Sequence, residues 1–426
     1  MNVYTSQDAF THFTSRTSSG HLESHEDVFS VVKKIQSDVF RDRDKALFSY
    51  TTTLDHLNFP LKNLRVSANE IQAAYQEVSP ELVKALRNAK KNIEAFHRHQ
   101  LPQNWEEKTL DGGHMGIRYQ PIEIVGLYVP GGRAVYPSTV LMNAIPAKLA
   151  GVFQTIMVTP PRPDGTIHPS LLVAADLCEV DVVLKCGGAQ AIFALAYGTE
   201  SVPKVDKIVG PGNKYVTLAK QLVYGQVDID KPAGPSEVLV YVEDSKQAAV
   251  AAAELIAQLE HDPDAIAIGL SPSESVLREI FREVMLQKTT CSREAIIDQS
   301  LRNVMLIVTE NQDDTVAWIN RIASEHLVLL VENYEPILNR VKHAGAVFCG
   351  LYSPVTIGDY YAGSNHVLPT GTTARFASPL GVSDFVKYMS VVSYTKEMLS
   401  ASASDLKILT DTEGFDGHYR AVSIRL

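Results

Sequence analysis

The chain has 426 residues, of which 45% are hydrophobic and 21% are charged. This length predicts two or three domains, and the composition is ordinary for a globular protein with sizeable hydrophobic cores. The formal net charge is −10 and there is no long run of Lys or Arg, which argues against binding to nucleic acid or to an anionic membrane.

The N-terminal segment, residues 1–26, is polar and lacks the apolar stretch of a secretion signal. No apolar run is long enough to cross a membrane. The four cysteines have irregular spacing and form no CxxC pair: Cys178, Cys186, Cys291 and Cys349. These features favour a cytoplasmic protein with reduced, buried thiols, in which a metal would be bound by His, Asp, Glu or amide ligands.

Residues 1–120 are predicted to form a helical N-terminal region that packs on the core. The sequence SANE at 67–70 has the spacing of a capping box, and the Ser-Pro step at 79–80 fits a helix start. Near the end of that second helix, His97 and His99 would point apart. We therefore expect both to face solvent rather than to chelate a metal.

From about residue 122 short apolar runs alternate with helical segments, which predicts parallel sheets covered on both faces. The expected strands are 122–129, 155–159, 181–185, 207–209, 237–242, 265–270, 304–308, 326–331 and 346–349. The predicted fold class is α/β, with two tandem incomplete Rossmann-like units at residues 121–236 and 237–375. The helical N-terminal region precedes them, and residues 376–426 form a small C-terminal arm or domain.

Three Gly-rich turns follow predicted strands of the first unit, at 128–132, 186–190 and 210–213. Such turns let a phosphate group approach backbone N–H groups at a helix N-terminus. None is a complete G-x-G-x-x-G, because the third glycine position after Gly210 is Tyr215. Glycine also serves strand-to-helix turns for geometric reasons alone, so a nucleotide site and purely structural turns both stay open.

The sequence 258–264 ends a predicted helix over 245–261, since Pro263 disfavours a helical conformation in the residue before it. Gln258 and His261 lie three residues apart and therefore share one face of the last turn. An amide oxygen and an imidazole in this position could make half a metal site. An ordinary solvated helix end explains the same spacing.

Glu325 and His326 stand next to each other at the start of a predicted strand. His can accept a proton near neutral pH while Glu activates a water molecule, so the two could divide acid–base work. A charge pair on an edge strand is the alternative. Further polar candidates lie in a Gly-containing stretch without clear periodicity and in the tail: Asp359, His366, Glu413 and His418.

Seven short runs, spread over nearly the whole chain, together resemble the histidinol dehydrogenase family. They are GLYVPGG at 126–132, GGAQA at 187–191, VGPGN at 209–213, AGPSE at 233–237, QLEH at 258–261, SEHL at 324–327 and AGSNHVLPT at 362–370. No single run is specific, but the set in this order is. The resemblance implies a cytoplasmic homodimer that oxidises L-histidinol to L-histidine with zinc and two NAD, through an enzyme-bound aldehyde, as the last step of histidine biosynthesis.

The resemblance also implies roles for individual residues. One Zn²⁺ per subunit would be bound by Gln258, His261, Asp359 and, from the other subunit, His418. The catalytic pair would be Glu325 and His326. NAD would contact Tyr128, Gln190 and Asn213. The substrate would contact Ser236, Gln258, His261, His326, Asp359, His366, Glu413 and His418. The first unit would be the NAD side, the second would carry the zinc and catalytic residues, and the arm 376–426 would be exchanged so that Glu413 and His418 serve the partner.

Two other classes of protein fit parts of the pattern. A metal-dependent hydrolase could use Gln258, His261, Asp359 and Glu325 around a metal-bound water and would need no dinucleotide. A two-lobed small-molecule binding protein would also show tandem α/β units, but it would turn nothing over and would usually carry an export signal. Formation of NADH from histidinol and NAD separates these alternatives from a dehydrogenase.

Overall fold

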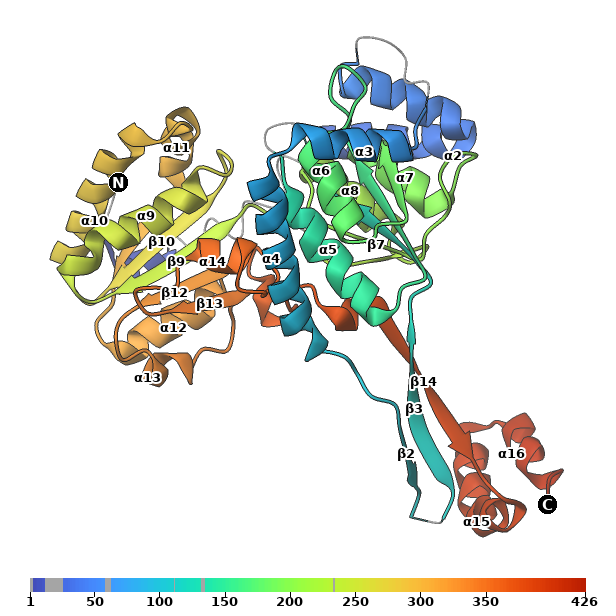
Figure 1. The fold of residues 1–426 in the computed structure, drawn as a ribbon. Helices are drawn as coiled ribbons and strands as arrows, with labels where there is room; N and C mark the ends of the chain where they lie inside the picture. The colour runs from blue at the N-terminus through green and yellow to red at the C-terminus, as the bar shows by residue number, and fades with distance from the viewer. Residues whose placement is uncertain (1–2, 12–25, 58–62, 111, 132–134, 233) are drawn as a thin grey trace.

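The structure of the protein, a computed structural model, describes residues 3–11, 26–57, 63–110, 112–131, 135–232 and 234–426. Two α/β lobes lie side by side, and an arm that carries the C-terminus projects away from them (Figure 1). Most of the polar N-terminal segment and two residues of the resembling runs, Gly132 and Ala233, lie outside these ranges. No helix within them is long and apolar enough to span a bilayer.

The first lobe is built on a five-stranded parallel sheet in the order β6-β5-β4-β7-β8. Its strands are β4 (Ile124–Tyr128), β5 (Gln154–Thr159), β6 (Val182–Lys185), β7 (Lys207–Val209) and β8 (Asp228–Ile229). Its helices are α5 (Pro137–Ala150), α6 (Pro169–Leu177), α7 (Gly188–Tyr197) and α8 (Lys214–Val223). The first strand lies in the middle with later strands on either side, which is the Rossmann strand order without its sixth strand.

The second lobe repeats this order as β11-β10-β9-β12-β13, with β1 (Val3–Thr5) added in parallel beside β11. Its strands are β9 (Glu237–Val242), β10 (Ile266–Ser271), β11 (Val304–Val308), β12 (His326–Leu330) and β13 (Ala346–Cys349). Its helices are α9 (Ala248–Leu259), α10 (Glu274–Gln287), α11 (Glu294–Ser300), α12 (Gln312–Ile322), α13 (Glu335–Leu338) and α14 (Val355–Tyr360). The predicted fold class, two tandem incomplete Rossmann-like units, is confirmed.

Strand β12 lies inside the second sheet, between β9 and β13. The interpretation of Glu325 and His326 as a charge pair on an edge strand is therefore wrong. The helix predicted over 245–261 is shorter than expected: a 3-10 turn at Ser245–Gln247 precedes α9. Gln258 lies in the last turn of α9, and His261 follows just after the helix end.

Three N-terminal helices, α2 (Glu26–Leu54), α3 (Ala68–Glu77) and α4 (Pro80–Arg98), pack on helices of the first lobe. The capping box is confirmed: Ser67 and Glu70 exchange hydrogen bonds at the start of α3. The expectation that His97 faces solvent is wrong. Its side chain is fully buried, one turn beyond Ile93 on the apolar face of α4, and its Nδ1 lies 2.9 Å from the Ile93 carbonyl oxygen. His99 is exposed, as expected.

Residues 1–120 are not wholly helical, because two of their strands belong to the arm. β2 (Trp105–Lys108) and β3 (His114–Pro121) form an antiparallel sheet with β14 (Val386–Ser393) in the order β14-β3-β2. Helices α15 (Lys396–Glu413) and α16 (Asp416–Ser423) follow at the far end (Figure 1). Further 3-10 turns span Lys288–Thr290, Leu301–Asn303, Thr373–Arg375 and Val382–Phe385. Of the four free cysteines, Cys178 and Cys186 are buried and Cys291 and Cys349 are half-buried.

Candidate active site

The Gly-rich turns of the first lobe meet at the carboxyl edge of its sheet. Tyr128 ends β4, and its hydroxyl accepts a hydrogen bond of 3.2 Å from the backbone N–H of Gly188. Gly210 follows the neighbouring strand β7 with a φ of +113°, and a Cβ there would lie 2.1 Å from the Tyr128 carbonyl oxygen. Only glycine fits this approach. The chain order reverses between β4 and β7, where open α/β sheets bind ligands.

Two of the residues expected to contact NAD, Gln190 and Asn213, differ in whether their side chains already have hydrogen-bond partners in the protein. Gln190 is fully buried, and neither atom of its side-chain amide has a hydrogen-bond partner in the described part of the chain. A buried amide without partners is costly unless a ligand satisfies it. Asn213 caps α8 by accepting from the backbone N–H groups of Tyr215 and Val216, at 3.0 and 3.2 Å. Its oxygen therefore has a structural role whether or not a ligand binds.

Two charged residues that the sequence analysis did not single out hold the Gly210 turn. Lys220 and Asp230 form a buried ion pair. The Lys220 ammonium also donates to the Gly210 carbonyl at 2.9 Å, and the Gly210 N–H donates to Asp230 at 2.8 Å. Losing one member would leave the other charge buried and unpaired, so the pair fixes this turn strongly. No spacing rule links these positions in the sequence.

The catalytic candidates lie at the amino ends of the strands in the second lobe. Glu325 and His326 are buried at the start of β12, beside the first residue of β9, Glu237. Glu325 Oε2 accepts a 2.8 Å hydrogen bond from the backbone N–H of Glu237, and His326 Nδ1 lies 3.0 Å from the Glu237 carbonyl oxygen. Because a carbonyl only accepts, Nδ1 carries the proton. In the neutral ring, Nε2 then holds the free lone pair.

Burial and mutual charge set the ionisation of this pair. Burial raises the pKa of Glu325 to about 7, although the nearby His326 charge opposes the shift. Burial lowers the pKa of His326, but Glu325 and Asp359 outweigh it and raise that pKa to about 9. His326 Nδ1 lies 3.7 Å from Glu325 Oε2, and its Nε2 lies 3.4 Å from Asp359 Oδ1. A carboxyl group that ionises near neutral pH is suited to general-base work.

The expected metal ligands of this chain converge on the same end of the lobe. Gln258 is buried, and its Nε2 has no hydrogen-bond partner among the described residues. Burial lowers the pKa of His261, against the attraction of Asp359, so its metal-binding neutral form is favoured. Burial alone would raise the pKa of Asp359, but hydrogen bonding and charge from His326 lower it. One amide, one imidazole and one carboxylate suit Zn²⁺.

The structure of one chain does not bring all the expected metal ligands together. Within the described ranges, no group of three or more His, Cys, Asp or Glu side chains is arranged to hold a metal ion. Of these residue types, the expected ligand set takes only His261 and Asp359 from one chain, together with the amide of Gln258. Glu413 ends α15 and His418 lies in α16, at the far end of the arm (Figure 1). The chain does not bring these two residues to its own site.

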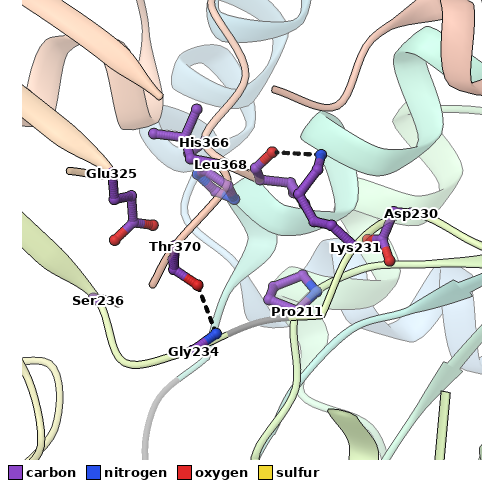
Figure 2. A pocket seen from close by; sticks show the side chains of 10 residues that line it. Pro211, Asp230, Lys231, Gly234, Ser236, Glu325, His366, Leu368 and Thr370 are labelled. Atoms are coloured by element: carbon purple, nitrogen blue, oxygen red, sulfur yellow. Dashed lines mark hydrogen bonds between the residues drawn. The ribbon is translucent and has the colours of Figure 1, made fainter. Parts of the chain in front are cut away.

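A cavity lies between the two lobes, and Figure 2 shows Glu325 and His366 on one side of it and Pro211 and Asp230 on the other. Ser236 also lines it. His366 Nδ1 lies 2.9 Å from the Asp359 carbonyl oxygen, and its Nε2 lies 3.1 Å from the Thr139 hydroxyl. Both ring nitrogens are therefore engaged by the protein. This geometry makes His366 a support of Asp359 as well as part of the cavity wall.

Lys231 is a further buried residue of the cavity wall. Its ammonium nitrogen is 3.4 Å from the Val367 carbonyl oxygen (Figure 2), and burial lowers its pKa. In the sequence, Lys231 follows Asp230, which accepts the hydrogen bond from the Gly210 N–H, and it precedes the AGPSE sequence at 233–237. The sequence analysis passed over it, because a single Lys in a polar segment is ordinarily solvent-exposed.

Gly345→Ala should disturb the catalytic pair without touching a catalytic group. A Cβ at this position would lie 2.5 Å from the Glu325 carbonyl oxygen and 3.2 Å from Pro369 Cδ. We expect a loss of about 1–3 kcal/mol in the free energy of unfolding and a fall in turnover of up to about 100-fold, because the Glu325 backbone must move. Thermal unfolding and steady-state kinetics measure both. Lys246→Ala, at an exposed side chain far from the pair in the sequence, is the control; equal behaviour of the two variants would contradict the expectation.

Together, the fold and the cavity define a two-lobed α/β enzyme in which a cavity between the lobes is lined by Glu325, the buried neighbour of His326. The sequence model of the histidinol dehydrogenase family matches residues 19–426. The chain is 46% identical over 412 residues to histidinol dehydrogenase of Thermosynechococcus vestitus, covering 96% of this chain and 95% of that protein. It is 48% identical over 383 residues to the enzyme of Heliobacterium mobile, with 90% of each covered.

A crystal structure of histidinol dehydrogenase from Elizabethkingia anophelis superposes with a TM-score of 0.91 at 38% sequence identity, covering 95% of this chain and 93% of that one. The chain therefore belongs to the histidinol dehydrogenase family. This membership supports an oxidoreductase over the two alternatives left open by the sequence, a metal-dependent hydrolase and a two-lobed binding protein.

Proposed function

We propose that the protein oxidises L-histidinol to L-histidine in the cytoplasm, in two NAD-dependent steps with L-histidinaldehyde held between them, as the last step of histidine biosynthesis. The observation that carries the proposal is the cavity between the lobes. There Glu325, with His326 buried next to it, faces the Gly-rich turn at Pro211, which belongs to the edge where Tyr128 and Gln190 lie. NAD bound at that edge would accept the hydride in each step.

Gln258, His261 and Asp359 would hold Zn²⁺, with His418 of the partner subunit as the fourth ligand. When bound, the ion would fix the imidazole and amino nitrogens of the substrate beside the catalytic pair. The burial of Gln258 in the last turn before His261 and the lowered pKa of His261 favour this assignment. Ser236, which lines the cavity, and Glu413 of the partner subunit would contact the substrate.

His326 would serve as the proton acceptor in both oxidations. The Glu237 carbonyl oxygen fixes Nδ1 as the nitrogen that keeps its proton. Loss of the second proton, with a pKa of about 9, therefore frees the lone pair of Nε2 for the reaction, which favours alkaline pH. In the first step, Nε2 takes the hydroxyl proton of the alcohol as hydride leaves its carbon. In the second step, it takes a proton from the aldehyde hydrate as the second hydride leaves.

Glu325 would act between the two oxidations. Its carboxylate would remove a proton from a water molecule as that water attacks the aldehyde carbon, which forms the hydrate. The backbone N–H of Glu237 holds Oε2 and leaves Oε1 for this task. A pKa of about 7 keeps the group basic enough to accept the proton and largely ionised at mildly alkaline pH.

The homodimer is part of the proposal. Helices α15 and α16 contain no buried residue, and their arm exposes large apolar side chains: Tyr388, Met389, Val392, Ile408, Leu409, Phe415 and Ile424. Such a surface is unusual for a protein that stays monomeric. Exchange of this arm between identical subunits would cover it and would deliver Glu413 and His418 to the partner's site.

Removal of the metal tests the zinc site. Chelation should abolish NADH formation from histidinol, and added Zn²⁺ should restore it. His261→Ala should weaken Zn²⁺ binding at least about tenfold, measured by competition with a chelating dye, because one of four ligands is lost. His99→Ala, at an exposed histidine just after the end of α4, is the matched control. Full turnover in a metal-free preparation would rule out the zinc assignment.

A further inference from the structure

We propose that Glu237 is a positioning residue for this oxidation: its buried side chain acts as a neutral carboxylic acid that ties the starts of β9 and β12 to the segment 370–371 and so holds Glu325 and His326 in place. The inference rests on the proposed function for its kinetic consequences. Its structural consequences can be measured independently.

The backbone of Glu237 contacts both catalytic residues. Its N–H donates to Glu325 Oε2 at 2.8 Å, and its carbonyl oxygen accepts from His326 Nδ1 at 3.0 Å. Both bonds run between neighbouring strands, since Val238 is paired in register with His326. A shift of this one residue would therefore move the carboxylate of Glu325 and could free His326 to adopt the wrong tautomer.

The side chain of Glu237 ties that backbone to the segment that follows Thr370, a residue of the cavity wall. Its Oε1 accepts a 3.1 Å hydrogen bond from the backbone N–H of Gly371. The same segment is tied a second time, because Thr370 Oγ1 accepts a 2.6 Å bond from the Gly234 N–H (Figure 2). Glu237 is 8% exposed, and its Oε2 has no hydrogen-bond partner in the described part of the chain.

The surroundings of the Glu237 carboxyl group favour its protonated form. Burial and the negative charge of Glu325 raise its pKa to about 8, while the Gly371 N–H and the His326 charge oppose the rise. No ion pair between Glu237 and Lys or Arg occurs among the described residues. Two ionised carboxylates buried beside each other would repel, so a neutral Glu237 allows Glu325 to ionise.

These features predict different outcomes for two substitutions. Glu237→Gln has the shape and charge of the protonated acid and can still accept from Gly371, so kcat near neutral pH should stay within about threefold of wild type. Glu237→Ala removes the tie, and a small displacement of the catalytic pair can lower kcat by about 100-fold with little change in KM. Both variants are made in the full-length, zinc-loaded dimer and assayed with histidinol.

Thermal unfolding provides a readout that does not depend on activity. With a folded pKa of about 8 against an ordinary value of 4.5, native Glu237 retains a proton that the unfolded chain has lost. Stability from this group is therefore complete below about pH 4.5 and falls as the pH rises towards 8. Between pH 5 and pH 8, the Tm of the wild type should therefore fall further than the Tm of Glu237→Gln.

The kinetic and thermal results distinguish a failure of the Glu237 proposal from a failure of the proposed function. A Glu237→Gln enzyme that folds but is as slow as Glu237→Ala would show that the negative charge is needed, and would overturn the proposal. A Glu237→Ala enzyme with a lower Tm but unchanged kcat would show a merely structural role and would also overturn it. If Glu237→Ala does not fold, the kcat and the Tm–pH slope of Glu237→Gln decide. A wild-type enzyme inert towards histidinol would refute the proposed function alone, since the Tm–pH comparison still tests the neutral acid.

Discussion

Glu325→Gln should slow the conversion of L-histidinaldehyde to L-histidine by about 10²- to 10⁴-fold, which is the usual contribution of a general base. The amide keeps the shape of the side chain and can still accept from the Glu237 N–H, so the fold of the site is preserved. The oxidation of histidinol to the aldehyde should suffer much less, because His326 accepts the proton in that step.

The two half-reactions are measured separately, with histidinol and with histidinaldehyde as the starting substrate. Glu332→Gln is the matched control, since Glu332 is exposed just beyond the other end of β12. Equal damage to both half-reactions by Glu325→Gln would mean that Glu325 supports the geometry of the whole site instead of activating water in one step.

Two inactive variants should restore activity to each other when their subunits are mixed. His326→Ala removes a catalytic group from the site built on its own chain, whereas His418→Ala would remove a zinc ligand from the partner's site. In a mixed dimer, the site on the His418→Ala chain keeps its own His326 and receives an intact His418. The other site collects both defects.

With random pairing, about half of the dimers are mixed and each has one intact site, so co-refolding should recover roughly a quarter of wild-type activity. Each variant refolded alone provides the baseline. If His418 served its own chain, every site in the mixture would carry one defect. The mixture would then stay as inactive as its components, and the shared site would have to be abandoned.

Much of the fold was predictable because buried parallel strands are short, continuous apolar runs. The predicted strands at 207–209, 237–242, 304–308 and 346–349 have the same bounds in the structure. Helix caps were predictable for a similar reason, since the Ser67 box depends only on neighbours in the sequence. These features are local, so their patterns survive in a single chain read without its tertiary contacts.

His97 shows where a local argument stops. Because His97 and His99 point apart on a helix, both were expected to face solvent, but the apolar face of α4 continues through Ile93 to His97 and buries it. Strand β1 is a second feature that local reasoning did not predict. This three-residue strand near the N-terminus pairs with β11 at the edge of the second sheet. Such pairings depend on which surfaces meet, and no spacing in the sequence encodes them.

The candidate residues were all visible in the sequence as polar groups in apolar or Gly-rich surroundings, and the family resemblance assigned their roles. Their arrangement came only from the tertiary structure. In the first lobe, the candidate ligand-binding residues lie at the carboxyl edge of the sheet, where open α/β sheets usually bind ligands. In the second lobe, the candidate catalytic residues instead lie at the amino edge of the sheet, where Glu325 and His326 stand at the start of β12 beside Glu237.

The sequence by itself therefore determined the class of fold, the number of units and the residues able to do acid–base or metal chemistry, because these follow from composition, periodicity and short motifs. The tertiary structure alone decided which of them face one cavity and which groups support them. The close approach of Gly345 to Glu325, the buried Lys220–Asp230 pair and the tie from Glu237 to Gly371 join residues that are distant in the chain. Contacts of this kind arise only when separate elements pack, since burial and backbone geometry then choose the partners.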